Sequence, residues 1–368
     1  MQVVFVDDES RVLAGIERTL VMRETDWSCR FLTSGQAALD ALETEPADVV
    51  VSDMRMPFMD GAALLGAVRD RWPGTLRIIL SGQCDTASTL RMLDVAHQFV
   101  SKPCDNAVLL AAVQAALSLR AMFRDASVID VIGRVNRLPS APRIFAELTR
   151  LLADPASDSR HVARLLSSDP ALSARIMQLA GSAYFTLGAR ITSINDAITR
   201  LGIDQVRLLV LASQIFADAA TDPFVDHLQR RALQASCLAD RITAGRRGGV
   251  AATASLLARI GLLVEPLRSE TMQDATTVCD TPLHAAVGAY LLGLWGLPMD
   301  IVDAVARHTH PDRAAATGFG LAGTVHVAVA LANGQTPDLA YLERAGVLDQ
   351  WPQWQAYNAA LTSDHDDD

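Results

Sequence analysis

Cysteine, basic charge and long apolar runs are all scarce in this chain of 368 residues. The five cysteines are odd in number and form no Cys-x-x-Cys pair, so we expect neither a disulfide framework nor a structural zinc site. Lysine and arginine number 32 against 42 for aspartate and glutamate, and the net charge of −10 repels nucleic-acid phosphate. No apolar run approaches the roughly 18 uncharged residues that span a bilayer. The composition therefore argues against DNA and membrane partners.

The apolar run at residues 3–6 lies so near the start of the chain that it leaves no room for a signal peptide. We therefore expect a cytoplasmic protein. Half of the residues are hydrophobic, and 368 residues suffice for about two domains with a core each.

Three short apolar runs in the first 105 residues are each followed by charged side chains. Asp7 and Asp8 follow residues 3–6, Asp53 ends the run at 49–53, and Lys102 follows the run at 99–101. Such runs are typical of parallel strands buried on both faces. Polar residues at the carboxyl ends of these strands share one crevice. We therefore expect three carboxylates and one ammonium to meet at one edge of a sheet.

This set of side chains is suited to Mg²⁺ and a transferable phosphoryl group. Carboxylates held close together repel one another unless a cation lies among them, and Mg²⁺ prefers oxygen ligands. One carboxylate can then act as the nucleophile toward phosphorus. Lys102 would place a positive charge on the phosphoryl oxygens, and the hydroxyl of Ser81, which ends the run at 76–80, would bond another of them.

At these residues the chain resembles the response-regulator receiver domain of two-component signalling, over about residues 1–122. The resemblance implies that Asp53 is the phosphoacceptor, that Ser81 and Phe99 are the switch residues, and that Lys102 is the active-site ammonium. It also implies a Mg²⁺ site of Asp7, Asp8, Asp53 and the Arg55 carbonyl, with Asp8 a direct ligand and Asp7 acting through water. The serine at position 81 departs from the more usual threonine of the family.

Helical periodicity is present between these strands and in most of the chain after them. Amphipathic segments at 11–23, 34–42, 60–72 and 105–123 alternate with strands, as a doubly wound, five-stranded parallel α/β domain requires. After Phe123 strand signals almost vanish. We expect a helical linker at 123–137, an all-α domain at 138–330, a helical extension at 331–361 and a disordered acidic tail at 362–368.

Several phrases of the second half resemble the HDOD domain, a helical relative of the HD-superfamily phosphohydrolases. They are Leu138-Pro139-Ser140-Ala141-Pro142, Ser168-Asp169-Pro170-Ala171-Leu172-Ser173, Ile191-Thr192-Ser193-Ile194-Asn195-Asp196-Ala197-Ile198, Leu201-Gly202-Ile203 and Trp295-Gly296-Leu297-Pro298. The resemblance covers about residues 130–320 and implies a degenerate HD-superfamily domain.

The adjacent His-Asp pair that a metal-dependent HD hydrolase needs is missing here. The corresponding phrase reads Ser255-Leu256-Leu257-Ala258-Arg259-Ile260-Gly261, in which Ala258 offers no ligand and the Arg259 guanidinium repels a metal ion. Arg259 either takes the place of the metal's charge and pairs with leftover acidic residues, or is a surface arginine. His284, His308 and His310 lie in a stretch similar to the family's His-rich segment. Without the His-Asp pair we interpret them as hydrogen-bonded structural residues.

The leading hypothesis is a response regulator without other enzymatic activity, phosphorylated on Asp53 by a sensor histidine kinase. Its helical half would act on an unidentified downstream protein, with homodimerisation through the receiver as a further option. The alternative is a cyclic di-guanylate phosphodiesterase or binder of the HD superfamily, against which Ala258 and Arg259 argue. A DNA-binding transcription factor is disfavoured because no helix-turn-helix with a basic second helix is recognisable.

Overall fold

Two compact units make up the chain, the first centred on residues 1–137 and the second on the residues that follow. The structure, a computed structural model, describes residues 1–23, 26–81, 95–102, 105–122, 128, 131–132, 159–181, 191–202, 206, 223–243, 249–268, 281–314 and 318–363. Most of the predicted linker at 123–137 and the last five residues of the predicted tail lie outside the described residues.

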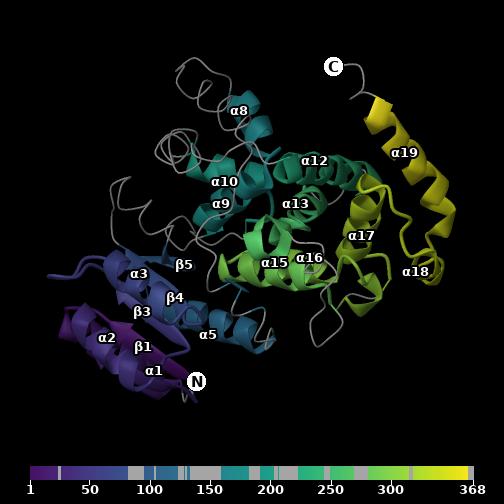
Figure 1. Cartoon of the computed structure of the whole chain (residues 1–368). Helices are drawn as coiled ribbons and strands as arrows, with labels where there is room; N and C mark the ends of the chain where they lie inside the picture. Colours follow the sequence, from purple (N-terminus) through teal and green to yellow (C-terminus); the bar gives the residue numbers. More distant parts are fainter. Residues whose placement is uncertain are drawn as a thin grey trace. The chain divides into compact units, whose positions relative to one another are not determined.

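The first unit contains a parallel sheet of five strands in the order β2-β1-β3-β4-β5 (Figure 1). Every neighbouring pair runs parallel. This confirms the predicted doubly wound sheet. The strands are β1 (Gln2–Val6), β2 (Ser28–Leu32), β3 (Val49–Asp53), β4 (Leu76–Ser81) and β5 (Gln98–Ser101).

Helices cover both faces of this sheet because the crossovers run in two directions. The chain passes from β1 to β2 at one edge of the sheet, and then returns past β1 to β3, β4 and β5 toward the other edge. Because each crossover is right-handed, connections in opposite directions place their helices on opposite faces. Accordingly α1 contacts α5 and α2 contacts α3. These helices are α1 (Ser10–Met22), α2 (Gly35–Thr44), α3 (Gly61–Arg71) and α5 (Asn106–Met122).

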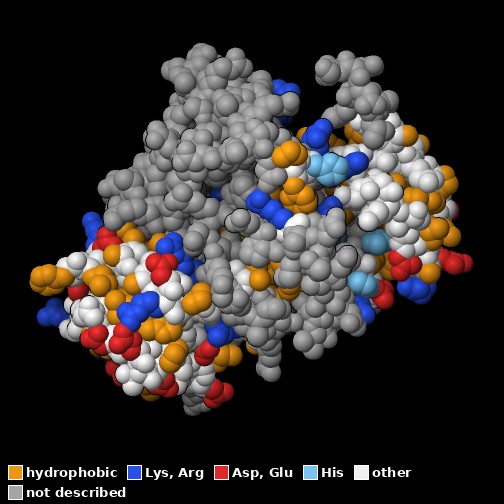
Figure 2. Space-filling view, viewed as in Figure 1, with side chains coloured by type: hydrophobic (Ala, Val, Ile, Leu, Met, Phe, Trp, Pro, Cys, Tyr) orange, Lys and Arg blue, Asp and Glu red, His pale blue; other side chains and the backbone are white. Residues whose placement is uncertain are grey.

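The core of this unit is the row of β-branched side chains in the central strands. Every residue of β3 and β4 is buried, as expected for strands covered on both faces. Asp60 and Ser34 begin α3 and α2, because each side-chain oxygen accepts a hydrogen bond from a backbone N–H of the first turn. Figure 2 shows acidic and basic side chains interspersed on the face of this unit turned to the viewer, so neither sign of charge dominates there.

The described residues of the second unit form α-helices and short 3-10 turns, as predicted. Helix α12 packs against α13 and α17, and α16 packs against both of the latter. The helices are α8 (Ser159–Leu166), α9 (Pro170–Gly181), α10 (Ile194–Leu201), α12 (Pro223–Thr243), α13 (Val250–Leu257), α15 (Leu283–Leu294), α16 (Met299–Arg307), α17 (Leu321–Ala332), α18 (Leu339–Arg344) and α19 (Trp351–Ser363).

The boundary expected at residue 330 falls inside α17, and the last helix contacts helices on the other side of it. Helix α19 contacts α12 and α17, and Trp354, 2% exposed, stacks on Phe319 with ring centroids 5.2 Å apart. The helix also continues to Ser363, beyond the expected start of the acidic tail. Burial of an aromatic side chain of this size explains why the last helix joins the core.

Among the described residues, no helix combines the length and the apolar character that crossing a membrane requires.

Candidate functional site

Asp53 and Asp7 meet through the ammonium of Lys102 at the carboxyl edge of the sheet. Lys102 Nζ lies 2.6 Å from Asp53 Oδ1 and 2.6 Å from Asp7 Oδ2. Asp53 is the last residue of β3, whereas Asp7 and Lys102 follow β1 and β5. Asp7 is 1% exposed and Asp53 is 7% exposed. The convergence predicted from the strand ends is therefore present for these three side chains.

The second oxygen of each carboxylate is held by the backbone of the adjacent loop. Asp53 Oδ2 accepts the N–H of Arg55 at 2.8 Å, and Asp7 Oδ1 accepts the N–H of Glu9 at 2.9 Å. These bonds leave Asp53 fixed in rotation, with Oδ1 facing the ammonium. A buried carboxylate so oriented is suited to act as a nucleophile.

Electrostatics keep Lys102 protonated in this pocket. Partial burial alone would lower the pKa of Lys102, but the hydrogen bonds and charges of Asp53 and Asp7 outweigh it and raise the pKa above its usual value. The site thus holds a permanent positive charge within reach of the Asp53 carboxylate.

Ser81 and Phe99 lie on the two strands beside this pocket. Ser81, 4% exposed, ends β4, and its backbone carbonyl accepts the N–H of Lys102 at 2.7 Å. Phe99 on β5 is 7% exposed. The Phe99 side chain is therefore already covered in this structure.

Asp8 and Arg55, the other two expected metal ligands, are exposed. Within the described residues, no three side chains of histidine, cysteine, aspartate or glutamate already surround a common position that fits a metal ion. The structure instead joins Asp7 and Asp53 through Lys102, whose ammonium neutralises the repulsion between the two carboxylates.

The loop after Asp53 has a backbone that only particular residues tolerate. A Cβ at Gly61 would lie 2.1 Å from the carbonyl oxygen of Asp53, so the start of α3 can approach β3 only as glycine. Phe58 has a φ of 67°, the one non-glycine residue with positive φ among those described, and its side chain is fully exposed. Bulky residues rarely adopt this conformation, so the loop beside the phosphoacceptor candidate carries strain.

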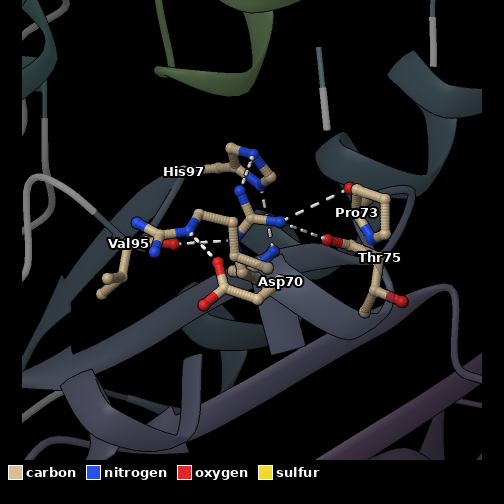
Figure 3. A network of polar contacts seen from close by, with 7 residues as sticks. Asp70, Pro73, Thr75, Val95 and His97 are labelled. Atoms are coloured by element: carbon tan, nitrogen blue, oxygen red, sulfur yellow. Dashed lines mark hydrogen bonds and ion pairs between the residues drawn. The ribbon is translucent and has the colours of Figure 1, made fainter. Parts of the chain in front are cut away.

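Sequence reasoning missed a buried arginine near the opposite end of the sheet. Arg77 on β4 is 2% exposed; its Nε donates to the Val95 carbonyl at 2.7 Å and its Nη1 donates to the Thr75 carbonyl at 3.1 Å (Figure 3). Its Nη2 lies 2.9 Å from Nε2 of His97. The available signal was one arginine inside the otherwise apolar run at 76–80.

Burial dominates the ionisation of this pair. It lowers the pKa of Arg77 to about 9, with the charge of Arg69 adding to the effect and that of Asp70 opposing it. Burial and the charge of Arg77 also hold the pKa of His97 well below its usual value. The pair joins the ends of neighbouring strands and is structural rather than part of the site around Asp53.

In the second unit, Arg259 does not pair with leftover acidic residues as one expectation had it. Its Nη1 donates a hydrogen bond to Oδ1 of Asn333, and no described carboxylate lies within ion-pair distance of it. Nor is it a freely solvated surface arginine, because burial lowers its pKa. The physical reason is its position at the start of a 3-10 turn, where the neighbours are helix ends rather than acidic side chains.

The three histidines differ from one another. Nδ1 of His308 lies 2.7 Å from the Val305 carbonyl, and Nδ1 of His310 lies 3.1 Å from Oγ1 of Thr309. For His284 the structure differs from the predicted hydrogen-bonded residue, because its buried Nδ1 has no hydrogen-bond partner. Sequence reasoning also missed His326, whose ring bonds the His308 carbonyl and the N–H of Asp338.

Comparison with known proteins identifies both halves of the chain. The family model of the response regulator receiver domain matches residues 3–114, and that of the HDOD domain matches residues 138–311. The DNA-binding transcriptional regulator NtrC of Klebsiella pneumoniae is 34% identical over 153 residues, which are 39% of this chain and 32% of that protein. The chain thus spans about a third of the length of this curated relative.

Solved structures resemble the chain as well. The MmoQ response regulator from Methylococcus capsulatus str. Bath is 25% identical, with 61% of this chain and 99% of that chain covered and a TM-score of 0.49. The signal receiver domain of an HD domain-containing protein from Pseudomonas fluorescens Pf-5 is 27% identical, with 33% and 90% covered and a TM-score of 0.31.

Proposed function

This chain joins a response regulator receiver domain to an HDOD domain, and we propose that it transmits a signal through phosphorylation of Asp53 by a sensor histidine kinase. The observation that carries the proposal is the contact of Lys102 Nζ with Asp53 Oδ1 at 2.6 Å, in a pocket where Asp53 is 7% exposed. A carboxylate nucleophile and a cation for the phosphoryl oxygens are the two groups that this transfer requires.

The side chains divide the reaction between them. Asp53 Oδ1 attacks the phosphorus of a phosphohistidine, the P–O bond forms as the P–N bond breaks, and the imidazole leaves with the bonding electrons and takes up a proton. The Arg55 N–H holds Oδ2 at 2.8 Å and so fixes which oxygen attacks. The Lys102 ammonium forms an ion pair with one phosphoryl oxygen, and the Ser81 hydroxyl donates a hydrogen bond to another phosphoryl oxygen.

The oxygen donors at this edge suit Mg²⁺. Asp7, Asp8, Asp53 and the backbone carbonyl of Arg55 would hold it, because carboxylate and carbonyl oxygens are the ligands that this ion prefers. When bound, Mg²⁺ neutralises negative charge on the transferred phosphoryl group. The contacts of Asp7 and Asp53 with the Lys102 ammonium support this, because the two carboxylates already share one positive charge.

The helical half then acts without chemistry of its own, by binding a downstream protein. Phosphorylation adds about 1.5 to 2 negative charges and three acceptor oxygens next to Ser81 and Phe99. Movement of these two residues changes the surface that β5 and α5 present, which alters receiver pairing or releases the helical half. The phosphodiesterase alternative needs a metal-bound water. Ala258, fully buried, offers no ligand for such a metal, and Arg259 would repel it.

Intact-mass spectrometry after incubation with acetyl phosphate and Mg²⁺ tests the proposal. The wild-type chain is expected to gain one phosphoryl group, and Asp53→Asn none. Asp70→Asn serves as the matched control, because this exposed aspartate of the same unit lies in α3, away from the pocket. Equal modification of wild type and Asp53→Asn, or no modification of either, would refute Asp53 as the phosphoacceptor.

A further inference from the structure

Arg259 lies near two buried histidines of the second unit, His284 and His308, because its charge acts on the pKa of both rings. Arg259 follows α13, His284 lies in the first turn of α15, and His308 ends α16 (Figure 1). The close approach depends on Gly261, where a Cβ would lie 2.0 Å from the His284 carbonyl oxygen. The rings of His284 and His308 are 5.8 Å apart. We call these three side chains the Arg259 cluster.

The Arg259 cluster carries a positive charge that nothing in the described part of the chain balances. Arg259 donates to the neutral amide of Asn333, and no described carboxylate forms an ion pair with it. The histidines add no charge at neutral pH. Burial, with smaller contributions from nearby positive charges that include Arg259, lowers the pKa of His284 to about 3 and that of His308 to about 4. A largely buried, unpaired cation is costly, so a counter-charge from outside the chain is favoured.

The cluster also contains a polar atom without a partner. His284 is only 9% exposed, and its Nδ1 is buried and forms no hydrogen bond. Buried polar atoms are nearly always paired, so an orphan of this kind indicates a missing partner. His326 shows the contrast, because both of its ring nitrogens are bonded to backbone groups.

The donors and the acceptor of the Arg259 cluster that have no partner indicate which kind of ligand fits it. Arg259 offers charge-assisted N–H donors, and neutral His284 can donate from Nδ1. In neutral His308, Nδ1 donates to the Val305 carbonyl at 2.7 Å, so Nε2 keeps a lone pair and can only accept. Hydrogen phosphate supplies both complements: oxyanion oxygens for the donors and a P–OH for the acceptor. A divalent cation would be repelled by Arg259.

We propose that Arg259, His284 and His308 bind a phosphate group, either as inorganic phosphate or as the terminal group of a phosphate monoester. The site lies in the HDOD half and is independent of phosphorylation at Asp53. It would give this half a small-molecule input of its own.

Isothermal titration calorimetry of the intact chain tests the site, in chloride buffer with EDTA and in an Asp53→Asn background. Titration with inorganic phosphate is expected to show saturable binding, and Arg259→Gln to weaken it at least about tenfold through loss of charge-assisted bonds. Arg344→Gln, the same change at an exposed arginine, should leave binding unchanged. A parallel titration with glycerol phosphate separates the two sources, since a site for monoesters binds it more tightly than inorganic phosphate.

Nitrogen NMR of the histidine rings gives a second readout that does not depend on the arginine variant. Phosphate should shift the Nδ1 resonance of His284 and leave both His326 nitrogens in place. If Arg259→Gln fails to fold, Arg259→Lys, which keeps the charge but loses the planar fork, should weaken binding in its place. No binding by the parent chain, equal binding by the folded Arg259 variant, or a shift absent at His284 would overturn the proposal.

Discussion

Lys102 holds the pocket around Asp53 together in the absence of a metal ion. Replacing it in Lys102→Met leaves two buried carboxylates facing each other, and we expect the free energy of unfolding of the first unit to fall by about 2 kcal/mol in EDTA. Chemical denaturation measures this. Mg²⁺ should then stabilise Lys102→Met more than wild type, because the ion replaces the lost charge; equal stabilisation of both would contradict the contact as the source of the effect.

Phe58 shows a second property of single residues in this loop. Its φ of 67° favours glycine, and its exposed side chain makes no packing contact that a substitution would remove. We expect Phe58→Gly to raise the free energy of unfolding by up to about 1 kcal/mol. Phe58→Ala, which keeps a Cβ, should show no such gain in the same denaturation experiment. A destabilised Phe58→Gly would mean that the aromatic ring is held by a contact after all.

At the scale of elements, α3 offers a matched pair of glycines. Gly61→Ala forces a Cβ against the Asp53 carbonyl oxygen, whereas a Cβ at Gly66 meets only Val95 Cγ1 at 3.7 Å. We expect Gly61→Ala to cost about 3 kcal/mol and to slow phosphorylation, because α3 must move away from the end of β3. Gly66→Ala should be neutral or stabilise by up to about 1 kcal/mol through helix propensity. Equal stabilities would refute the close approach.

The helices of the second unit should lose stability in mild acid because His284 and His308 are buried in the neutral form. Their pKa values of about 3 and about 4 lie below the unfolded value of 6.5, so the unfolded chain binds more protons between these limits. Stability is therefore complete above pH 6.5 and falls by about 1.4 kcal/mol per pH unit for each histidine as the pH drops toward 4. Denaturant melts across this range should show a shallower slope for His284→Gln than for wild type; an unchanged slope would contradict its burial as a neutral ring.

Some helix ends depend on one side chain that can be read from the sequence. Asp60 caps α3 by accepting the N–H of Ala63 at 2.7 Å. Ser193 caps the start of α10, and Gly202, with a φ of 75°, ends that helix. The burial of Arg77 could not be predicted, because it depends on hydrogen bonds to the Val95 carbonyl and the His97 ring, both far from Arg77 in the sequence. The stacking of Trp354 on Phe319, across the boundary predicted at residue 330, joins residues that periodicity alone does not connect.

At the scale of the whole molecule, the sequence predicted two folds in series, and the described residues confirm both. The convergence of Asp7, Asp53 and Lys102 could be predicted because strand ends of a parallel sheet meet at one edge. The Arg259 cluster could not, because its members come from different helices and its character depends on an unpaired Nδ1. Spacing in a helical chain does not reveal which helix ends meet.

Hydrogen-exchange mass spectrometry on the intact chain, with and without acetyl phosphate and Mg²⁺, tests most directly whether the receiver controls the helical half. We expect phosphorylation to change amide exchange within residues 138–363 as well as around Asp53, and Asp53→Asn to abolish both changes. Changes confined to residues 1–122 in a fully phosphorylated wild-type chain would contradict control of the helical half, because the signal would then end in the domain that receives it.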